Sequence, residues 1–219
     1  MKISYRQILP LYFRIWKIWR EKRFAVFQSK IASERIGHLL DVGGCPSDWY
    51  GRGELVGRVT TLNLAIPGEF TPPPGSPVIE SIEGDARKLR MSDGEYEVVY
   101  SNSVIEHVGT FEDQMAFAEE VRRVGGKLWI QTPAFSCPVE PHYLGFFVHW
   151  IPLRWRWPFI RWGTFIGLSG AAGEYGLRCI MQTTRLLTYR EFSTLFPDCE
   201  IWVERMLWVI PKSYVAIRR

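Results

Sequence analysis

The chain has 219 residues, of which 47% are hydrophobic, enough to bury the core of an α/β domain and to exclude a largely disordered protein. The net charge is +4 at neutral pH, but residues 1–30 alone carry +7, which leaves −3 for the other 189 residues. A general nucleic-acid-binding surface is therefore not expected. The four cysteines lie far apart, in no zinc or disulfide spacing, so we expect a reducing, cytoplasmic location.

Residues 1–35 are predicted to form an N-terminal helical arm, because aromatic and aliphatic residues recur between basic residues across 11–35. Basic residues and Pro10 interrupt the apolar ones, so neither a signal peptide nor a membrane-spanning helix is predicted. The basic and aromatic composition leaves two interpretations open. The arm is either a helix over the active site or a peripheral contact with the inner face of the membrane.

Strands and helices alternate after the arm. The predicted strands are 37–42, 58–64, 78–85, 96–102 and 127–133. An amphipathic helix is predicted at 110–124, a second helix begins after Thr188, and the last twenty residues are expected to form two closing strands around Pro211. This alternation predicts one Rossmann-like, doubly wound domain with a mostly parallel seven-stranded sheet.

We divide this single domain into four parts. The arm is followed by a cofactor-binding core, an aromatic-rich insert on the acceptor side, and a closing helix with strands, at 36–133, 134–187 and 188–219.

The ends of the predicted strands carry the candidate cofactor site. Two glycines, Gly43 and Gly44, follow a buried strand, but the rest of a dinucleotide-binding loop is missing. An acid at Asp41 would repel a pyrophosphate, whereas it suits the cationic end of S-adenosylmethionine. Asn63 is placed to meet the ribose hydroxyls, and Asp85 with the Ala86 N–H to meet the adenine. The full set of predicted cofactor-binding residues is Asp41, Gly43, Gly44, Asn63, Asp85, Ala86, Ser101 and Asn102.

The region from Leu39 to Pro133 resembles the class I S-adenosylmethionine-dependent methyltransferases, in particular the type 11-like group. The resemblance is carried by LLDVGG, LNL, EGDARKL, YEVVYSNSVIEHV and FAEEVRRVGGKLWIQTP, and PVEPHYLGFFVHWIP is similar to the segment after the fifth strand in bacterial members. It implies S-adenosylmethionine as cofactor and methyl transfer as activity. Cys45, Asn63 and Glu97 depart from the Gly, acid and Asp that are common in the family at these positions. These departures support the alternative of a non-catalytic binding or scaffold protein that kept the fold.

Three residues are candidates for catalysis: His142, His107 and Glu106. A histidine titrates near neutrality and can take a proton from an attacking hydroxyl. His142 is the preferred base, because prolines hold its loop close to the expected acceptor; the other interpretation is a loop histidine paired with Glu140. Some relatives bind a divalent metal through E-x-x-E-H, but Ser103 stands in the first position here, so no metal site is predicted.

The insert is expected to contact the acceptor through Tyr143, Glu140 and Trp150. Its run of Trp and Arg residues is typical of a membrane interface or of a lid over an apolar or sugar acceptor, and also of ordinary aromatic packing. The predicted reaction is methylation of an oxygen of a small-molecule or glycan-type acceptor. The charge of the residues outside the arm argues against methylation of nucleic acid, and the oligomeric state is not predicted.

Overall fold

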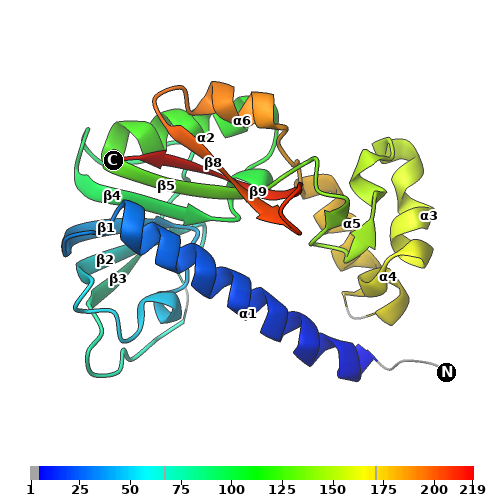
Figure 1. Cartoon of the computed structure of the whole chain (residues 1–219), viewed down its shortest axis with the longest axis horizontal. Coiled ribbons are helices and arrows are strands. Elements are labelled where there is room, and N and C mark those ends of the chain that lie inside the picture. The colour runs from blue at the N-terminus through cyan, green and yellow to red at the C-terminus, as the bar shows by residue number, and fades with distance from the viewer. Residues whose placement is uncertain (1–4, 67, 171) are drawn as a thin grey trace.

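The computed structural model describes residues 5–66, 68–170 and 172–219, with side chains from Lys17 onward. One sheet of seven strands runs in the order β3-β2-β1-β4-β5-β9-β8 (Figure 1). The first five strands are parallel and β9 is antiparallel to both of its neighbours. The strands are β1 Ile36–Val42, β2 Val56–Asn63, β3 Val78–Glu83, β4 Tyr96–Asn102, β5 Gly125–Pro133, β8 Glu200–Met206 and β9 Ile210–Arg218. The predicted fold class is therefore confirmed.

Helices cover both faces of this sheet (Figure 1). On one face, α1 (Tyr5–Lys30) buries Phe27 in a core with Trp49 and Trp129, and Ile31, directly after the helix, joins the same core. On the other face lie α2 (Phe111–Val124) and α6 (Tyr189–Leu195). Neighbouring strand residues alternate between the two cores, as Leu39 and Leu40 do, because successive side chains of a strand point to opposite faces.

The predicted helix starts are confirmed by their caps. Thr110 and Thr188 each accept a hydrogen bond from the backbone N–H three residues on, and the acid at that position bonds back, so both α2 and α6 begin with a capping box. The first helix ends at Lys30, five residues before the predicted end at 35. The aromatic side chains predicted at 11–16 of this helix lie outside the described side chains.

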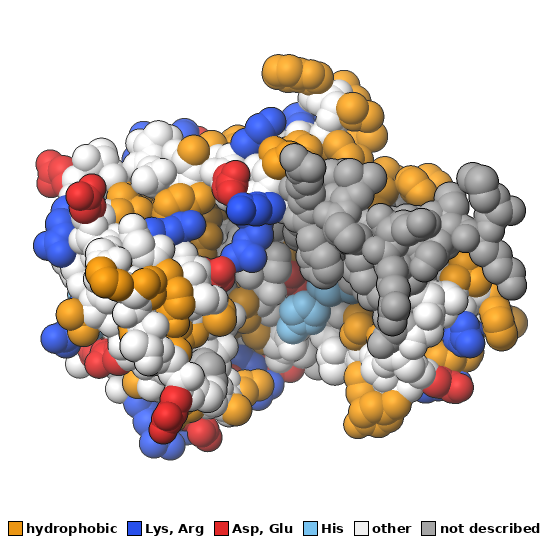
Figure 2. Space-filling model, turned by 90° about the horizontal axis from the view of Figure 1, so that it is seen from below, with side chains coloured by type: hydrophobic (Ala, Val, Ile, Leu, Met, Phe, Trp, Pro, Cys, Tyr) orange, Lys and Arg blue, Asp and Glu red, His pale blue; other side chains and the backbone are white. Residues whose placement is uncertain are grey.

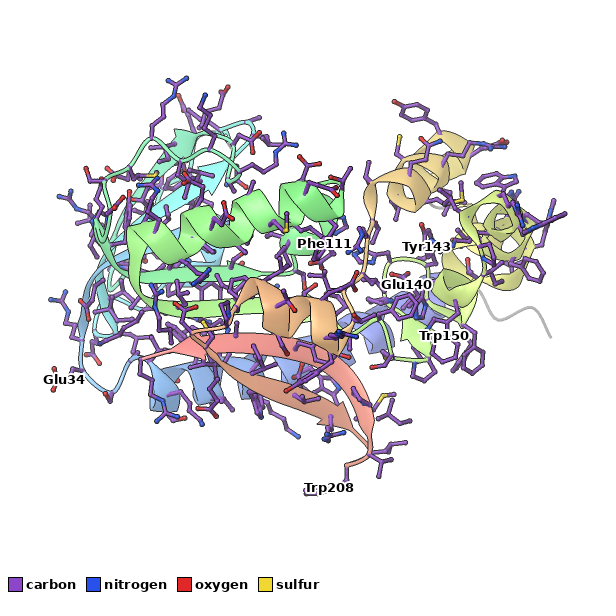
Figure 3. All side chains as sticks on the ribbon, turned by 90° about the horizontal axis from the view of Figure 1, so that it is seen from above. Glu34, Phe111, Glu140, Tyr143, Trp150 and Trp208 are labelled. Carbon is purple, nitrogen blue, oxygen red and sulfur yellow. The ribbon has the colours of Figure 1, made fainter. Side chains whose placement is uncertain are left out.

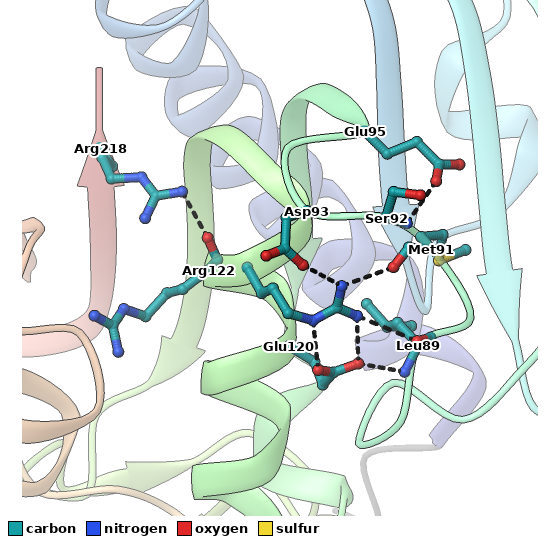
Figure 4. Close-up of polar contacts among 9 residues, drawn as sticks. Leu89, Met91, Ser92, Asp93, Glu95, Glu120, Arg122 and Arg218 are labelled. Atoms are coloured by element: carbon teal, nitrogen blue, oxygen red, sulfur yellow. Dashed lines mark hydrogen bonds and ion pairs between the residues drawn. The ribbon is translucent and has the colours of Figure 1, made fainter.

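Arg123 of α2 fixes the loop between β3 and β4 (Figure 4). Its guanidinium donates to the carbonyl oxygens of Leu89 and Met91 and pairs with Asp93 and Glu120. The loop is thereby held against the helix by charge-assisted hydrogen bonds, in addition to the packing of Leu89 and Met91 against the main core.

The predicted break between the closing strands at Pro211 is wrong. The two strands form a hairpin that turns at 207–209, and Pro211 lies inside β9 opposite Arg205, next to a register shift. Leu207 and Trp208 have φ of 49° and 67°, the left-handed conformation of a tight hairpin turn. Such turns usually contain Gly or Asn, so Leu-Trp gave no turn signal in the sequence.

The insert leaves and rejoins the sheet at one point. Ala134 and Leu187 form a parallel bridge, and Phe135 N–H donates to the Leu187 carbonyl oxygen. Between them lie a small hairpin and three helices: β6 Val139–Glu140, β7 Gly145–Phe146, α3 Leu153–Gly163, α4 Phe165–Ser169 and α5 Gly173–Thr183. This lobe has its own core, centred on Tyr143, Ile160 and Leu177. None of the described helices combines the length and apolar character that a bilayer crossing requires.

A buried ion pair joins α1 to the closing hairpin. Arg23 donates to Glu204 at 2.8 Å with both side chains about 95% buried, and to Asn102 Oδ1 at 2.7 Å. Arg23 therefore links the helix to β8 and to the carboxyl end of β4.

We expect Arg23→Ala to lower the free energy of unfolding by about 3 kcal/mol, because it leaves the buried Glu204 carboxylate without its closest cation. The matched control is Arg20→Ala on the same helix, whose pair with Asp48 is exposed and should contribute less than about 1 kcal/mol. Urea denaturation followed by circular dichroism measures both. Equal losses in the two variants would contradict a structural role for the buried pair.

Candidate functional site

A cavity of about 390 Å³ opens at the carboxyl ends of β1 to β4. The chain turns outward in opposite directions from the neighbouring strands β1 and β4, so this is the switch point where doubly wound sheets bind ligands. The lining residues are Val42, Gly43, Leu62, Asn63, Leu64, Ala65, Gly84, Asp85, Ala86, Arg87, Val104, His107 and Val108. The structure thus brings four predicted cofactor residues, Gly43, Asn63, Asp85 and Ala86, together with the predicted catalytic His107.

Packing requires both glycines that follow β1. Gly43 has φ of 74°, and a Cβ there would lie 2.5 Å from Val104 Cγ2. A Cβ on Gly44 would lie 1.7 Å from the Asp41 carboxylate. A side chain at either position would therefore collide with the protein itself, whether or not a ligand occupies the cavity.

Asp41 is buried behind this glycine turn and does not line the cavity. It is 2% exposed, and its Oδ2 accepts a hydrogen bond of 2.7 Å from Trp49 Nε1. Burial raises the pKa of Asp41 to about 7. The structure therefore places this carboxylate behind the glycine turn and not on the cavity wall, and its contact with a cationic ligand stays a prediction.

Polar groups converge on the other side of the cavity. Asn63 Nδ2 donates to the Gly44 carbonyl oxygen at 3.0 Å, which ties the second strand end to the glycine turn. Asp85 pairs with Arg87 at 2.6 Å, and Arg87 also reaches Asp113. The hydrogen bonds from Arg87 hold the pKa of Asp85 below its ordinary value, so this acid is an ionised acceptor at neutral pH.

Ser101 and Asn102 are not on the cavity wall. Ser101 is fully buried and its Oγ donates to the Val42 carbonyl oxygen, while Asn102 Oδ1 accepts from Arg23. Both residues hold the ends of strands and helix α1 in place, and their contact with a ligand stays a prediction.

Two histidines meet where the insert faces the sheet. His107 lies in a short helical turn after β4 (Ile105–His107), and His142 follows β6 of the insert. Their Nε2 atoms are 3.0 Å apart, and His142 Nδ1 is 2.5 Å from Glu140 Oε1. Figure 2 shows histidine side chains in the hollow between the body of the molecule and the insert. The predicted base, His142, thus lies beside the turn that follows β4, although it is 35 residues from His107 along the chain.

The environments of the two rings push their pKa values apart. Burial, together with the charge of His142, lowers the pKa of His107 to about 4. Burial also disfavours charge on His142, but the hydrogen bond and the charge of Glu140 outweigh it and raise its pKa. When the pair carries one positive charge, the proton between the two Nε2 atoms therefore belongs to His142, and His107 accepts it; this arrangement is inferred from the contacts.

Glu106 lies directly behind this pair. It is fully buried, its Oε2 accepts from Thr132 Oγ1 at 3.0 Å, and its Oε1 has no hydrogen-bond partner in the described part of the chain. Burial raises the pKa of Glu106 to about 7. One ligand atom each from Glu106, His107 and His142 lies within 4.8 Å of the other two, a set that could hold a metal ion.

The three predicted acceptor contacts of the insert have different surroundings (Figure 3). Glu140 is 1% exposed and binds His142 and the Tyr143 N–H, so it positions the histidine. Tyr143 is 2% exposed and belongs to the core of the insert, which argues against contact with an acceptor. Trp150 is exposed, and its indole N–H donates to the Phe135 carbonyl oxygen.

A larger cavity of about 620 Å³ lies between α6 and the closing hairpin, lined by Tyr189, Arg190, Arg205 and Tyr214 among others. It contains none of the predicted cofactor residues and no histidine. We therefore assign the functional site to the smaller cavity, where glycine backbone, an ionised acid and His107 converge.

Sequence reasoning missed two residues of the site. Arg87 lines the cavity, and Thr184 Oγ1 lies 3.4 Å from His107 Nδ1. Arg87 stands two residues after Asp85, so the spacing alone could have indicated a local ion pair. Thr184 comes 77 residues after His107, at the end of the insert, and no local pattern points to it.

The arrangement matches known proteins in both sequence and fold. Residues 59–130, about a third of the chain, match a family model described as "Methyltransferase domain". The N-methyltransferase NodS from Bradyrhizobium japonicum WM9, solved with S-adenosyl-L-homocysteine, gives a TM-score of 0.52 at 10% identity, over 91% of this chain and 86% of that chain. A protein of Anabaena variabilis ATCC 29413 is described as a methyltransferase of an antibiotic biosynthesis pathway. It gives a TM-score of 0.53 at 14% identity, over 84% of this chain and 64% of that chain. No curated protein sequence matches.

These findings confirm the resemblance drawn from the sequence motifs, and with it the predicted cofactor at the level of the family. At such low identities the solved structures establish the fold alone. They do not identify the acceptor or the atom that is methylated.

The buried Asp41 generates a prediction about stability and pH. Its pKa is about 7 in the folded protein and about 3.9 in an unfolded chain, so only the folded state holds the proton between these values. The stability that this group contributes is complete below about pH 4 and is lost as pH rises through 7. We expect Asp41→Asn, which mimics the protonated form, to exceed the parent in stability at pH 8 by about 1–4 kcal/mol and to lose this advantage towards pH 4.

Urea unfolding of both proteins across this pH range measures the difference. Comparing the two proteins at each pH cancels the contribution of other titrating groups such as Glu106. An Asp41→Asn protein that is less stable than the parent at pH 8 would contradict a buried, uncompensated carboxylate.

Proposed function

We propose that this chain, which contains a class I methyltransferase domain of the type 11-like family, transfers a methyl group from S-adenosylmethionine to an oxygen of a small-molecule or glycan-type acceptor. One observation carries the proposal. The cavity at the strand ends, where a cofactor of this family would lie, is lined by His107, and His107 is joined to His142 and Glu140.

In this proposal the cavity wall binds the cofactor without phosphate-binding groups. The turn at Gly43 allows close approach of the backbone, Asn63 faces the ribose, and the ionised Asp85 accepts from the adenine amino group. Leu64, which is 77% exposed at the cavity, offers an apolar surface to the flat adenine ring. Alignment of acceptor oxygen, methyl carbon and sulfur would supply much of the rate.

The histidines would receive the proton of the acceptor. In the transfer the O–H bond breaks, an O–CH3 bond forms, and the S–CH3 bond breaks to leave neutral S-adenosylhomocysteine. The lowered pKa keeps His107 uncharged at neutral pH, and a proton taken up by the pair would reside on His142, whose pKa Glu140 raises. The Glu140 carboxylate then stabilises the resulting charge, in the way an acid orients a catalytic histidine elsewhere.

Two single variants separate cofactor binding from catalysis. We expect Asp85→Ala to weaken S-adenosylmethionine binding about 10-fold, since an acceptor of the buried adenine is lost. We expect His142→Ala to leave that affinity within about two-fold but to lower methyl transfer at least about 100-fold. Calorimetry gives the affinities, and transfer of labelled methyl groups to a panel of phenols, sugars and carboxylic acids gives the rates.

The controls are Asp93→Ala, whose carboxylate pairs with Arg123 away from the cavity, and His38→Ala, at the opposite end of β1. Neither should change affinity or rate. A parent protein that does not bind S-adenosylmethionine would contradict the proposal and favour a scaffold protein that kept the fold. Full activity of His142→Ala would show that the acceptor needs no base from this loop.

We further propose that the protein works in the cytoplasm as a peripheral protein on the inner face of an anionic membrane. Apolar side chains project at the tip of the β8–β9 hairpin, where Leu207, Trp208 and Val209 are 74%, 93% and 70% exposed (Figure 3). Helix α3 adds the exposed side chains of Leu153, Trp155, Phe159 and Trp162, together with three arginines and no acid. Aromatic and basic side chains in this mixture suit the headgroup region of a bilayer.

We expect the parent to sediment with vesicles that contain phosphatidylglycerol and not with pure phosphatidylcholine vesicles. Trp208→Ser should reduce this binding roughly 10-fold, because the most exposed apolar side chain no longer enters the interface. Tyr175→Ser, which removes an aromatic ring 83% exposed on α5, is the matched control. Equal binding of Trp208→Ser and the parent would contradict insertion of the hairpin tip.

A further inference from the structure

The contact between the two histidines has an unusual geometry for a hydrogen bond between side chains. Both rings present Nε2 to the other, at 3.0 Å and with the ring planes 89° apart. Only one of the two nitrogens can carry the shared proton, so one lone pair must always face the other ring's nitrogen. Two imidazole nitrogens that each lie about 2.1 Å from one cation and subtend about 90° are also about 3.0 Å apart. The positions of the two Nε2 atoms therefore suit a shared cation as well as a shared proton.

A third donor lies at the same place. Glu106 is fully buried, and its Oε1 has no partner among the residues that the structure describes, although Thr132 binds the other oxygen. A buried carboxylate oxygen that lacks a hydrogen bond is costly, and coordination of a metal ion would remove this cost. One ligand atom from each of the three side chains lies within 4.8 Å of the others.

The outer contacts of the histidines are those of metal ligands. His142 uses Nδ1 to contact the buried Glu140 carboxylate at 2.5 Å, and His107 uses Nδ1 to face Thr184 Oγ1 at 3.4 Å. Carboxylates and hydroxyls that hold the second ring nitrogen fix the tautomer and aim the first nitrogen at the metal. Each histidine thus has its Nε2 turned inward and its Nδ1 held from outside.

We infer that Glu106, His107 and His142 form a binding site for one divalent first-row transition ion. Two imidazoles and one carboxylate on one side of the ion leave positions open for water or for an acceptor oxygen, as in octahedral sites for Mn²⁺, Fe²⁺ or Co²⁺. Hard ions such as Mg²⁺ prefer oxygen ligands and should bind poorly. No metal site was predicted here from the sequence, because the three donors come together only in the fold, where the insert supplies His142.

The role of this ion, unlike its binding, rests on the proposed function. A bound cation would occupy the position of the proton that His107 and His142 share. It would lower the pKa of an acceptor hydroxyl in the open position, and Glu140 would then act as a positioning residue for His142. Without the ion, the histidine pair is left to accept the proton itself.

Titration of the full chain with Co²⁺, without cofactor or acceptor, tests the site. Calorimetry should show one Co²⁺ per chain, and the visible absorption should report nitrogen ligands. Glu106→Gln, His107→Gln and His142→Ala should each weaken binding at least about 100-fold, and Glu140→Gln about 10-fold. His38→Ala is the control with a histidine removed elsewhere and should bind as the parent does.

Thermal unfolding shows which of the variants fold, and three different ligand substitutions ensure that at least one is informative. Failure of the parent to bind Co²⁺ at one per chain, or unchanged binding in the folded ligand variants, would overturn the inference. Since S-adenosylmethionine is absent from this titration, its result is independent of the proposed function. A protein that binds Co²⁺ but not S-adenosylmethionine would refute only the methyltransferase proposal.

Discussion

The contact between the Glu140 carboxylate and His142 is the constraint on which the site depends. It lies in the insert, whereas His107 and the cavity belong to the sheet. The carboxylate is almost fully buried and accepts from both the His142 ring and the Tyr143 backbone, so the orientation of the ring is fixed before any ligand arrives. Without this contact, His142 would be one residue of a loop with no reason to face the end of β4.

A second set of buried contacts holds the other side of the histidine pair. Gln114 of α2 is fully buried and donates to the carbonyl oxygens of Ile105 and Arg185, while the Arg185 N–H donates to the Glu106 carbonyl oxygen. The turn that carries Glu106 and His107 is thereby bound to the segment in which the insert returns. One glutamine therefore sets the distance between sheet and insert, because buried amide hydrogen bonds are costly to leave unmade.

Much of the fold was predictable because it follows from local patterns. Alternating strands and amphipathic helices, together with Thr188 as a cap, indicated the order of the elements. The strand ends correctly identified the edge of the sheet where the cavity lies. Individual side chains were less predictable. Asp41, Ser101 and Asn63 were all predicted from their positions at the carboxyl ends of strands. The side chains of Asp41 and Ser101 nevertheless point into the protein, because the direction of a side chain at a strand end depends on packing that the sequence does not show.

The insert posed a different difficulty, because its key relations are long-range. The prolines around 138–141 indicated a stiff loop near the site, which agrees with the position of His142. Nothing local distinguished Tyr143 as a core residue of a separate lobe, or the hairpin turn at Leu207-Trp208, which lacks the usual glycine. The aromatic ring is buried at Tyr143 and exposed at Trp208, and composition alone does not distinguish a buried aromatic residue from an exposed one.

The narrow neck of the insert has an evolutionary consequence. Ala134 and Leu187 form a β-bridge with each other, so the two ends of the 52-residue segment between them lie side by side. A segment attached in this way can be lengthened, shortened or exchanged without shifting the register of any strand, because its two ends already meet. This lobe can differ between related proteins while the strand ends around the cavity stay unchanged, which makes the neck a natural junction for building chimaeras.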